Sequence, residues 1–359
     1  MSNIYNFSPG PSKIPFEVIN KAQESVKKFK KTGNSILEIS HRSKEFEEIL
    51  DEINENFEKL ISLPKNFKVL LLQGGATFQN ALIPFNVDPL KSIGCLVTGS
   101  WGYQTSQDYF KSFKNIKVLD IRDKEIQKYI GKENTDFSEL DYLHITSNET
   151  IEGVQIRNFN NLKHDNLIID MSSDFCSYKY SFNNLSYVYA GAQKNMGIPG
   201  VTICLVNNNF LEQDLVNPSY LDLKKLTNAN SIMNTPPTFS IYIVKLITDW
   251  MIQMGGIEYF ESKSKKQSAY LYNFLDHQSS LIKTNFKGEF RSRSNVVFSF
   301  LEDTHNKNFI SDAKSIGIIG INGHRSVGGI RVSLYNSIDE QTFLYFMDFF
   351  EKFIDSNNL

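Results

Sequence analysis

The segment SYVYAGAQKNMGIPG, residues 186–200, joins an apolar, aromatic run to a turn that contains a lysine. Residues 186–190 have the composition of a buried β-strand. Lys194 follows this run closely, although a lysine at the surface needs no such setting. In open α/β sheets, ligands bind beyond the carboxyl ends of the strands. The segment therefore predicts a strand of such a sheet, with the ammonium group of Lys194 at the end where a ligand binds.

The strand pattern of residues 186–190 recurs along the first two thirds of the chain. Short apolar runs rich in β-branched and aromatic residues alternate with helical or irregular stretches. Runs that are apolar throughout indicate strands of a mainly parallel sheet that is covered by helices on both faces. The predicted strands are 67–72, 92–97, 116–121, 141–146, 166–171, 186–190 and 201–206.

Helices are predicted on both sides of this strand pattern. Residues 16–31 and 43–62 carry apolar residues at helical spacing, and Ser43 is the expected N-cap of the second helix. A long helical stretch, residues 238–280, contains a break at Gly255-Gly256.

The last part of the chain predicts a separate, smaller α/β unit. Strands at 295–300 and 329–335 alternate there with helices at 306–317 and 339–354. The domains expected are an N-terminal segment, 1–15, that packs with the small domain, a large domain, 16–260, and the small C-terminal domain, 261–359.

The composition is that of a globular protein without a basic or membrane-spanning region. Lys and Arg total 38 against 40 Asp and Glu, which does not favour binding to nucleic acid or to an anionic membrane. No window reaches the roughly 18 apolar residues of a membrane span, and the N-terminal residues have no targeting pattern. The three cysteines and six histidines lack the spacing of disulfide or zinc motifs. We expect a cytoplasmic protein without a bound metal.

A carboxylate and an amine are predicted at the ends of two successive strands. Asp170 ends the run NLIID and Lys194 follows the next strand, so both can face one ligand in the crevice of the sheet. Pyridoxal phosphate needs such a pair, because an amine binds it covalently and a carboxylate keeps its pyridine nitrogen protonated. A capping aspartate and a surface lysine are the simpler interpretation of the same residues.

Two further segments fit the other parts of this cofactor. In LLLQGGATFQNALIPF, residues 70–85, a strand, a glycine turn and a helical start predict that the amides around Ala76 and Thr77 bind an anion. The segment is neither a P-loop nor a dinucleotide fingerprint, and an ordinary turn is the alternative. Trp101 follows a strand in TGSWGYQ, where its indole fits stacking on a pyridine ring or a place in the core.

Seven motifs occur in the order, and at about the spacings, of the class V aminotransferases, which the chain resembles from residue 4 to about 355. The motifs are FSPGP, EISHRSKEF, LQGGATFQNALIPFN, NETIEGVQ, AGAQKNMGIPG, MNTPPTFSIY and GHRSVGGIRVSLYN. The resemblance implies fold type I of the pyridoxal-phosphate-dependent transferases. In that fold a large domain with a mainly parallel seven-stranded sheet is joined to a smaller α/β C-terminal domain.

The resemblance also implies a role for each cofactor-site residue. Lys194 would bind pyridoxal 5'-phosphate covalently and, once released, move a proton; Asp170 would contact the pyridine nitrogen, and Trp101 would stack on the ring. The residues matched to the phenolic oxygen and the phosphate of the cofactor are Thr150, Gln193, Ala76 and Thr77. Asn234 and Thr235 match a pair that reaches the phosphate from the second subunit of a homodimer with shared active sites.

The substrates that the resemblance implies are glutamate and 3-phosphohydroxypyruvate, which give 2-oxoglutarate and O-phosphoserine in serine biosynthesis. The related phosphohydroxythreonine reaction of vitamin B6 synthesis stays open beside it. Each substrate carries a carboxylate and a second anionic group, so the site needs several fixed cations, and arginine suits bidentate contacts with both. Arg331 is implied for the α-carboxylate. The residues implied for the phosphate or the distal carboxylate are His41, Arg42, His324 and Arg325; a solvated surface is the alternative for either His-Arg pair.

Rival functions fit fewer of these residues. A cysteine desulfurase needs a catalytic cysteine after the lysine, whereas Cys204 lies in an apolar run. An aminotransferase of the alanine–glyoxylate type needs no phosphate pocket, and a non-enzymatic binding protein on this fold would need neither Lys194 nor Asp170. The motifs also depart from the family pattern at Pro9, Ala76 and Phe78, which leaves the details of the phosphate and substrate loops open.

Overall fold

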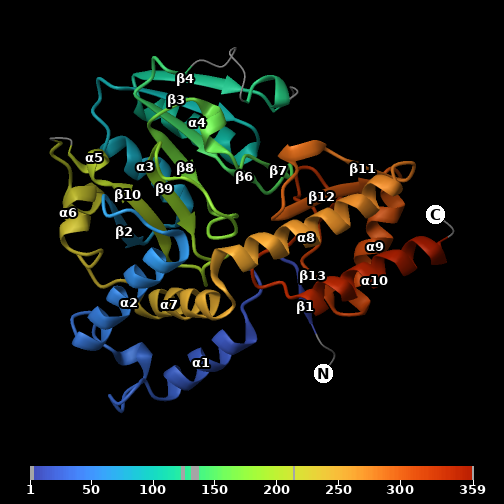
Figure 1. Ribbon diagram of the computed structural model, residues 1–359, viewed down its shortest axis with the longest axis horizontal. Helices are drawn as coiled ribbons and strands as arrows, with labels where there is room; N and C mark the ends of the chain where they lie inside the picture. Colours follow the sequence, from blue (N-terminus) through green and yellow to red (C-terminus); the bar gives the residue numbers. More distant parts are fainter. Residues whose placement is uncertain (1–3, 123–125, 131–136, 213–214, 358–359) are drawn as a thin grey trace.

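A seven-stranded sheet forms the centre of the larger part of the molecule (Figure 1). The structure is a computed structural model that describes residues 4–122, 126–130, 137–212 and 215–357. The order of the strands is β2-β10-β9-β8-β5-β3-β4. Their bounds are β2 Phe67–Leu72, β3 Ser92–Val97, β4 Asn115–Asp120, β5 Tyr142–Thr146, β8 Leu167–Asp170, β9 Leu185–Gly191 and β10 Thr202–Asn207.

The strands confirm the sheet that was predicted from the apolar runs, with bounds that agree to within about two residues. Strands β4, β3, β5, β8 and β9 are parallel, and β10 runs antiparallel to both of its neighbours, β9 and β2. The carboxyl ends of the parallel strands therefore meet at one edge of the sheet. This edge carries Asp170, the last residue of β8, and the turn after β9 that contains Lys194.

Helices cover both faces of this sheet (Figure 1). On one face, Leu82 and Ile83 of α3 and Tyr109 of α4 share a hydrophobic cluster with strand residues such as Val97 and Tyr189. On the other face, α1, α2 and α7 form a larger cluster with alternate residues of the same strands. The bounds of these helices are α1 Phe16–Lys27, α2 Lys44–Ile61, α3 Gly75–Phe85, α4 Ser100–Ser112 and α7 Thr238–Gln253, and short helices α5 Asn208–Leu211 and α6 Leu223–Asn228 lie after β10.

The C-terminal part has a sheet and a hydrophobic core of its own. Its antiparallel sheet has the order β11-β12-β14, and a parallel pair, β1 and β13, joins the N-terminal segment to it. The bounds are β1 Tyr5–Asn6, β11 Ile282–Thr284, β12 Asn295–Phe300, β13 Ile318–Ile319, β14 Ile330–Ser333, α9 Asp303–Ser315 and α10 Glu340–Ser356. A hairpin of β6 Asn148–Glu149 and β7 Val154–Gln155 lies between the two parts.

Helix α8, Gly256–His277, connects the two hydrophobic cores. Ile257 and Phe260 of its first turns belong to the core of the large sheet, whereas Leu271 and Leu275 belong to the core of the small one. The predicted break at Gly255-Gly256 separates α7 from α8, because both glycines have positive φ angles. The domain boundary between residues 260 and 261 stays a prediction, and residues 1–3 of the predicted N-terminal segment lie outside the described residues.

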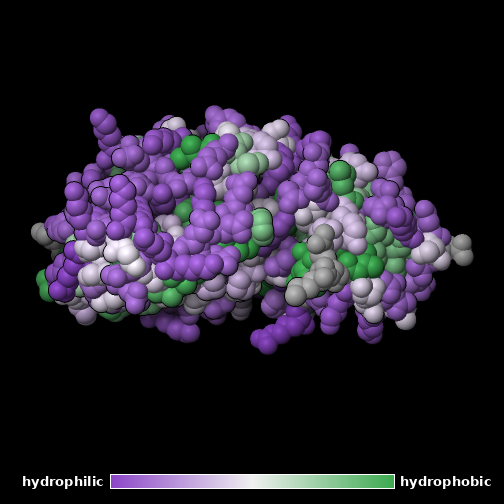
Figure 2. All heavy atoms as spheres, turned by 90° about the horizontal axis from the view of Figure 1, so that it is seen from below, coloured by the Kyte–Doolittle hydropathy of each residue, from purple (hydrophilic) through white to green (hydrophobic). Residues whose placement is uncertain are grey.

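Two helices differ from their predictions, since α1 ends earlier than residue 31 and α9 spans Asp303–Ser315 where 306–317 was predicted. Helix α1 ends at Lys27, since Lys28 is extended and Lys30 has a positive φ angle. The face of the molecule that Figure 2 shows is largely hydrophilic, with hydrophobic residues scattered over it. Within the described residues, every helix is too short or too polar to span a bilayer.

Candidate active site

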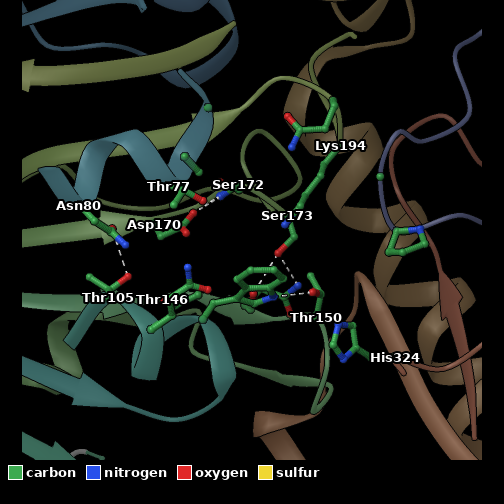
Figure 3. Close-up of a pocket in the computed structure, with 18 of the residues that line it drawn as sticks. Thr77, Asn80, Thr105, Thr146, Thr150, Asp170, Ser172, Ser173, Lys194 and His324 are labelled. Carbon is green, nitrogen blue, oxygen red and sulfur yellow. Dashed lines mark hydrogen bonds between the residues drawn. The ribbon is translucent and has the colours of Figure 1, made fainter. Parts of the chain in front are cut away.

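A cavity of about 400 Å³ lies at the carboxyl edge of the large sheet (Figure 3). Residues from the large sheet, the N-terminal segment and the C-terminal part all contribute to its wall. Among the predicted site residues, those that line it are Ala76, Thr77, Trp101, Thr150, Asp170, Gln193, Lys194, His324 and Arg331. The chain therefore brings together, in one cavity, residues that are up to 255 positions apart between Ala76 and Arg331.

Lys194 and Asp170 face the same cavity from neighbouring strands. Figure 3 shows both side chains directed into it. Burial lowers the pKa of the Lys194 ammonium, while the carboxylate of Asp170 acts in the opposite direction. A lowered pKa enlarges the neutral fraction of the amine, which is the form that acts as a nucleophile and as a base. The simpler interpretation of Lys194 as a surface lysine is wrong.

Asp170 is held in place by the turn that follows β8. Its Oδ1 accepts a hydrogen bond of 2.8 Å from the amide of Ser172. Burial raises the pKa of the carboxyl, and the charge of Lys194 and the hydrogen bonds from Ser172 lower it. The carboxyl group of Asp170 thus borders the open space of the cavity together with the amine of Lys194. Such a group can hold a protonated ring nitrogen.

Trp101 lies in the first turn of α4 and lines the cavity. The side chain is 37% exposed, so the alternative of a core tryptophan is wrong. Its Nε1 donates a hydrogen bond of 2.9 Å to Oγ1 of Thr150, and Nζ of Lys194 lies 5.9 Å from the centroid of the indole ring. The indole therefore presents a flat apolar face beside the amine, as stacking on an aromatic ligand requires.

The N-terminus of α3 forms another part of the wall. Gly74 at the N-cap has a φ of 93°, and a Cβ added there would lie 2.7 Å from Cβ of Phe78. Gly74 is therefore required by both conformation and space. Since a glycine N-cap offers no side chain to the first amides of the helix, the amides around Ala76 and Thr77 remain available for an anion.

Arg331 is a buried cation without a carboxylate partner among the described residues. It is 8% exposed and lies on β14, and its Nη1 donates a hydrogen bond of 3.3 Å to the carbonyl oxygen of Thr150. Its Nε is buried and has no hydrogen-bond partner in the described part of the chain. Burial lowers the pKa of the guanidinium, and Tyr335 and Glu152 raise it. A free, buried guanidinium at the wall of a cavity is suited to bind the carboxylate of a ligand.

His324 is the other basic residue from the C-terminal part that lines the cavity. Its Nδ1 accepts a hydrogen bond of 3.3 Å from the amide of Ser326 and lies 2.7 Å from the Ser326 hydroxyl. Because Nδ1 is an acceptor, the proton of the neutral ring lies on Nε2. The neighbouring Arg325 is exposed and does not line the cavity.

The remaining predicted residues lie outside this cavity. His41 and Arg42 belong to a turn before α2, and Asn234 and Thr235 belong to the segment before α7. Gln73, next to the glycine turn, approaches both members of the second pair, with Nε2 at 3.4 Å from Oδ1 of Asn234 and from the carbonyl oxygen of Thr235. Within one chain, these pairs do not reach the residues around Lys194.

Three carboxyl groups near the cavity, those of Glu149, Glu152 and Asp174, were missed in the sequence, and two of them, Glu149 and Asp174, are buried. Burial, helped by the charge of Glu152, raises the pKa of Glu149 to about 8. Burial also raises the pKa of Asp174 to about 6, against hydrogen bonds from Gln155, Ser147 and Tyr178. The motifs NETIEGVQ and DMSSD contain all three residues, but nothing in the sequence distinguishes these acids from exposed ones.

The fold and the cavity together define an aminotransferase of class V. Residues 4–343 match the family described as Aminotransferase class-V, and the chain belongs to this family. The phosphoserine aminotransferase of Bacillus cereus (strain ATCC 14579) is 37% identical over 357 residues, which cover 98% of this chain and 99% of that protein.

Two solved structures are similar over almost the whole chain. The phosphoserine aminotransferase from Bacillus circulans subsp. alkalophilus is 32% identical, with a TM-score of 0.91 and coverage of 99% of both chains. The pyridoxal-phosphate-bound phosphoserine aminotransferase from Trichomonas vaginalis is 28% identical, with a TM-score of 0.89 and coverage of 97% of this chain and 100% of that one.

The residues in the cavity fit pyridoxal phosphate. The cofactor needs an amine, a carboxylate for the ring nitrogen, a flat apolar surface and donors for a phosphate group. Lys194, Asp170 and Trp101 supply the first three, and the N-terminus of α3 supplies free amides.

Proposed function

We propose that this aminotransferase uses pyridoxal phosphate to transfer an amino group between glutamate and 3-phosphohydroxypyruvate, giving 2-oxoglutarate and O-phosphoserine. The observation that carries the proposal is the cavity that Lys194 and Asp170 both line, together with the basic side chains of Arg331 and His324. The phosphoserine aminotransferases that are 37% and 32% identical over nearly the full chain support this substrate over those of alanine–glyoxylate enzymes.

Lys194 is assigned two tasks. When bound, the cofactor supplies an electrophilic carbon and a ring that accepts electrons from the substrate. Lys194 holds the cofactor before the substrate enters, and its amine then moves the proton to and from the substrate Cα. The lowered pKa of Lys194 supports the second task, because a neutral amine accepts this proton.

Asp170 holds the proton on the pyridine nitrogen of the cofactor. The hydrogen bond from Ser172 orients its carboxylate toward the cavity. Burial raises the pKa of Asp170 and so favours its neutral form. A positively charged ring nitrogen beside it would lower this pKa, and the carboxylate would then remain ionised.

The substrate anions are assigned to the cations on the other side of the cavity. Arg331 binds the α-carboxylate, which is common to all the substrates, and its unpartnered Nε supports this role. His324 offers an Nε2–H donor to the phosphate or the distal carboxylate. Arg325, on the same exposed loop, is proposed to contact the phosphate when the substrate is bound.

The full site is proposed to need a second copy of the chain. Asn234 and Thr235 are expected to reach the cofactor phosphate of the other subunit in a homodimer with shared active sites. His41 and Arg42 line no part of the cavity of their own chain in the described residues, so their predicted role also requires the other subunit.

The three cysteines are all unpaired and buried, which supports the expected cytoplasmic location.

A coupled assay on purified protein tests the proposed substrates. Glutamate with 3-phosphohydroxypyruvate should give 2-oxoglutarate, and glyoxylate in place of the phosphorylated acceptor should give much less. Equal or faster turnover with glyoxylate and alanine would show that the enzyme is of the alanine–glyoxylate type. O-phosphohydroxythreonine, run as the amino donor, separates serine biosynthesis from the reaction of vitamin B6 synthesis.

A further inference from the structure

The first turn of α4, which carries Trp101, is not capped in the usual way. Its N-cap residue is Gly99, which has no side chain to accept a hydrogen bond from the helix. The first amides of a helix have no partner inside the helix and need one elsewhere. In this protein the acceptors come from the β6–β7 hairpin, about 50 residues further along the chain.

Two glutamates of this hairpin accept hydrogen bonds from the amides of Ser100, Trp101 and Gly102. Oε2 of Glu149 accepts from the amide of Trp101 at 2.9 Å, and Oε1 accepts from the amide of Gly102 at 2.8 Å. Oε1 of Glu152 accepts from the amide of Ser100 at 2.9 Å and from its hydroxyl at 2.5 Å. Carboxylates at a helix N-terminus are stabilised by the helix dipole as well as by these bonds.

The two carboxyl groups are packed directly against the start of the helix. Glu149 is fully buried. A Cβ added to Gly99 would lie 2.5 Å from Cγ of Glu149 and 2.5 Å from Oε2 of Glu152. Glycine at position 99 thus gives both acids room to approach the helix from the same side.

The indole ring of Trp101 is fixed by the same hairpin. Thr150, which lies between the two glutamates, accepts the hydrogen bond from Nε1 of Trp101 at 2.9 Å. Trp101 is a member of none of the hydrophobic clusters in the described residues. Hydrogen bonds from its backbone and its ring therefore help to fix its position at the cavity.

We propose that Glu149 and Glu152 are positioning residues, which hold the Trp101 indole in place for stacking on the cofactor by binding the first turn of α4. Only one part of this inference, the stacking of Trp101 on the cofactor, rests on the proposed function. Neither glutamate lines the cavity, so neither is placed to contact the substrate directly.

The acid pair also predicts a pH dependence of the Trp101 environment. The charged groups around Glu149 are Glu152 of the same hairpin, Asp170 of β8 and Lys194 after β9, with Arg331 of β14 beside Glu152. Burial and the charge of Glu152 raise the pKa of Glu149 to about 8. As the pH rises through about 8, Glu149 loses its proton. Both of its oxygens can then accept hydrogen bonds from the amides of Trp101 and Gly102.

Hydrogen exchange on the purified full-length protein tests the anchoring. In Glu149→Gln an amide group replaces the carboxylate, and one of its two atoms cannot accept a hydrogen bond. Above about pH 8, where Glu149 is ionised, the amide of Trp101 or that of Gly102 should exchange about tenfold faster or more in this variant, since a hydrogen bond to a charged acceptor is lost. Glu47→Gln, an exposed glutamate on α2, is the matched control and should leave this exchange unchanged.

A fluorescence titration tests the link to the indole. The chain has only two tryptophans, so Trp250→Phe leaves Trp101 as the single reporter. Its emission should change in a transition near pH 8, and Glu149→Gln should remove this transition. If Glu149→Gln does not fold, Glu152→Gln replaces it: the amide of Ser100 should then exchange faster, and the fluorescence transition should move to lower pH, because the charge of Glu152 raises the pKa of Glu149.

A double-mutant cycle decides between positioning and a general effect on stability. The rate of the half-reaction with glutamate should fall in Glu149→Gln, but little further in the background of Trp101→Phe. An equal fall in both backgrounds, no fall in either, or unchanged hydrogen exchange would each overturn the inference. If the wild type does not react with glutamate, the proposed function fails, while the exchange and fluorescence results still decide the anchoring.

Discussion

Replacing Arg331 by methionine should separate the binding of substrate from the stability of the fold. Arg331 is 8% exposed. In the described residues its Nε has no partner, and its only hydrogen bond is the one to the carbonyl oxygen of Thr150. Methionine has a similar length and no charge. The substitution therefore removes the proposed ligand of the α-carboxylate without opening a large hole.

The expected loss of activity follows from the geometry of a guanidinium and a carboxylate. Two charge-assisted hydrogen bonds at about 1.5 to 3 kcal/mol each amount to roughly 3 to 6 kcal/mol, or about a hundredfold to ten-thousandfold in kcat/KM. Because every substrate has an α-carboxylate, the loss should be similar for glutamate, phosphoserine and alanine. Rates of the three half-reactions, followed through the absorbance of the cofactor, measure it.

The stability should not fall in parallel. A buried polar group without a partner costs about 1 to 3 kcal/mol, and methionine removes that cost. Loss of the hydrogen bond to Thr150 offsets about 0.5 to 1.5 kcal/mol of the gain. The free energy of unfolding without ligand, from denaturant titration, should therefore be equal to or above that of the wild type.

Two results would refute this reasoning. A loss of kcat/KM for phosphoserine alone would show that Arg331 binds the phosphate and not the α-carboxylate. A drop in the free energy of unfolding of several kcal/mol would show that Arg331 stabilises the fold. Arg331→Lys serves as the control, because it keeps a charge without the planar fork. The addition of 2-oxoglutarate should stabilise the wild type much more than Arg331→Met.

Four further outcomes are expected. Lys194→Ala should abolish turnover, and borohydride treatment of the holoenzyme followed by peptide mapping should label Lys194; a label on another lysine would contradict the assignment. Asp170→Ala should retain the cofactor but slow the half-reaction with glutamate by orders of magnitude, since a neutral pyridine is a poor acceptor of electrons; a near-normal rate would leave Asp170 as a strand-end cap. Arg325→Ala should lose about tenfold to a hundredfold in kcat/KM for phosphoserine and much less for alanine, whereas an equal loss for both would exclude a phosphate contact. Mixing Lys194→Ala with a variant that carries bulky residues at Asn234 and Thr235 should restore activity towards about a quarter of the wild type per subunit, and no recovery despite subunit exchange would argue against a shared site.

The strand ends could be predicted because apolar runs and parallel strands leave few choices for where a polar residue goes. Asp170 and Lys194 each follow a run of residues that are buried on both faces, so their positions at one edge follow from the pattern. Family resemblance added Thr150 and Arg331, which come from segments that no local pattern would bring together.

Glu149 could not be predicted, because its role depends on contacts between distant segments. Its sequence neighbours favour an exposed turn, and only the fold places it against the start of α4, where it is fully buried. The same limit applies to Arg325. The motif GHRSVGGIR identifies the loop, but the exposure of Arg325 and the place of His324 at the cavity follow from the turn at residues 325–327.

Helix α8 packs against both parts of the molecule that form the cavity. It is anchored by Phe260 in the core behind Lys194 and by Leu271 in the core behind Arg331. With its 22 residues, the helix is about 33 Å long, so a tilt of about 5° at one end displaces the other end by roughly 3 Å. A displacement of that size equals the length of a hydrogen bond. The orientation of α8 therefore contributes to the distance between Lys194 and Arg331, together with the hydrogen bond from Arg331 to the carbonyl oxygen of Thr150.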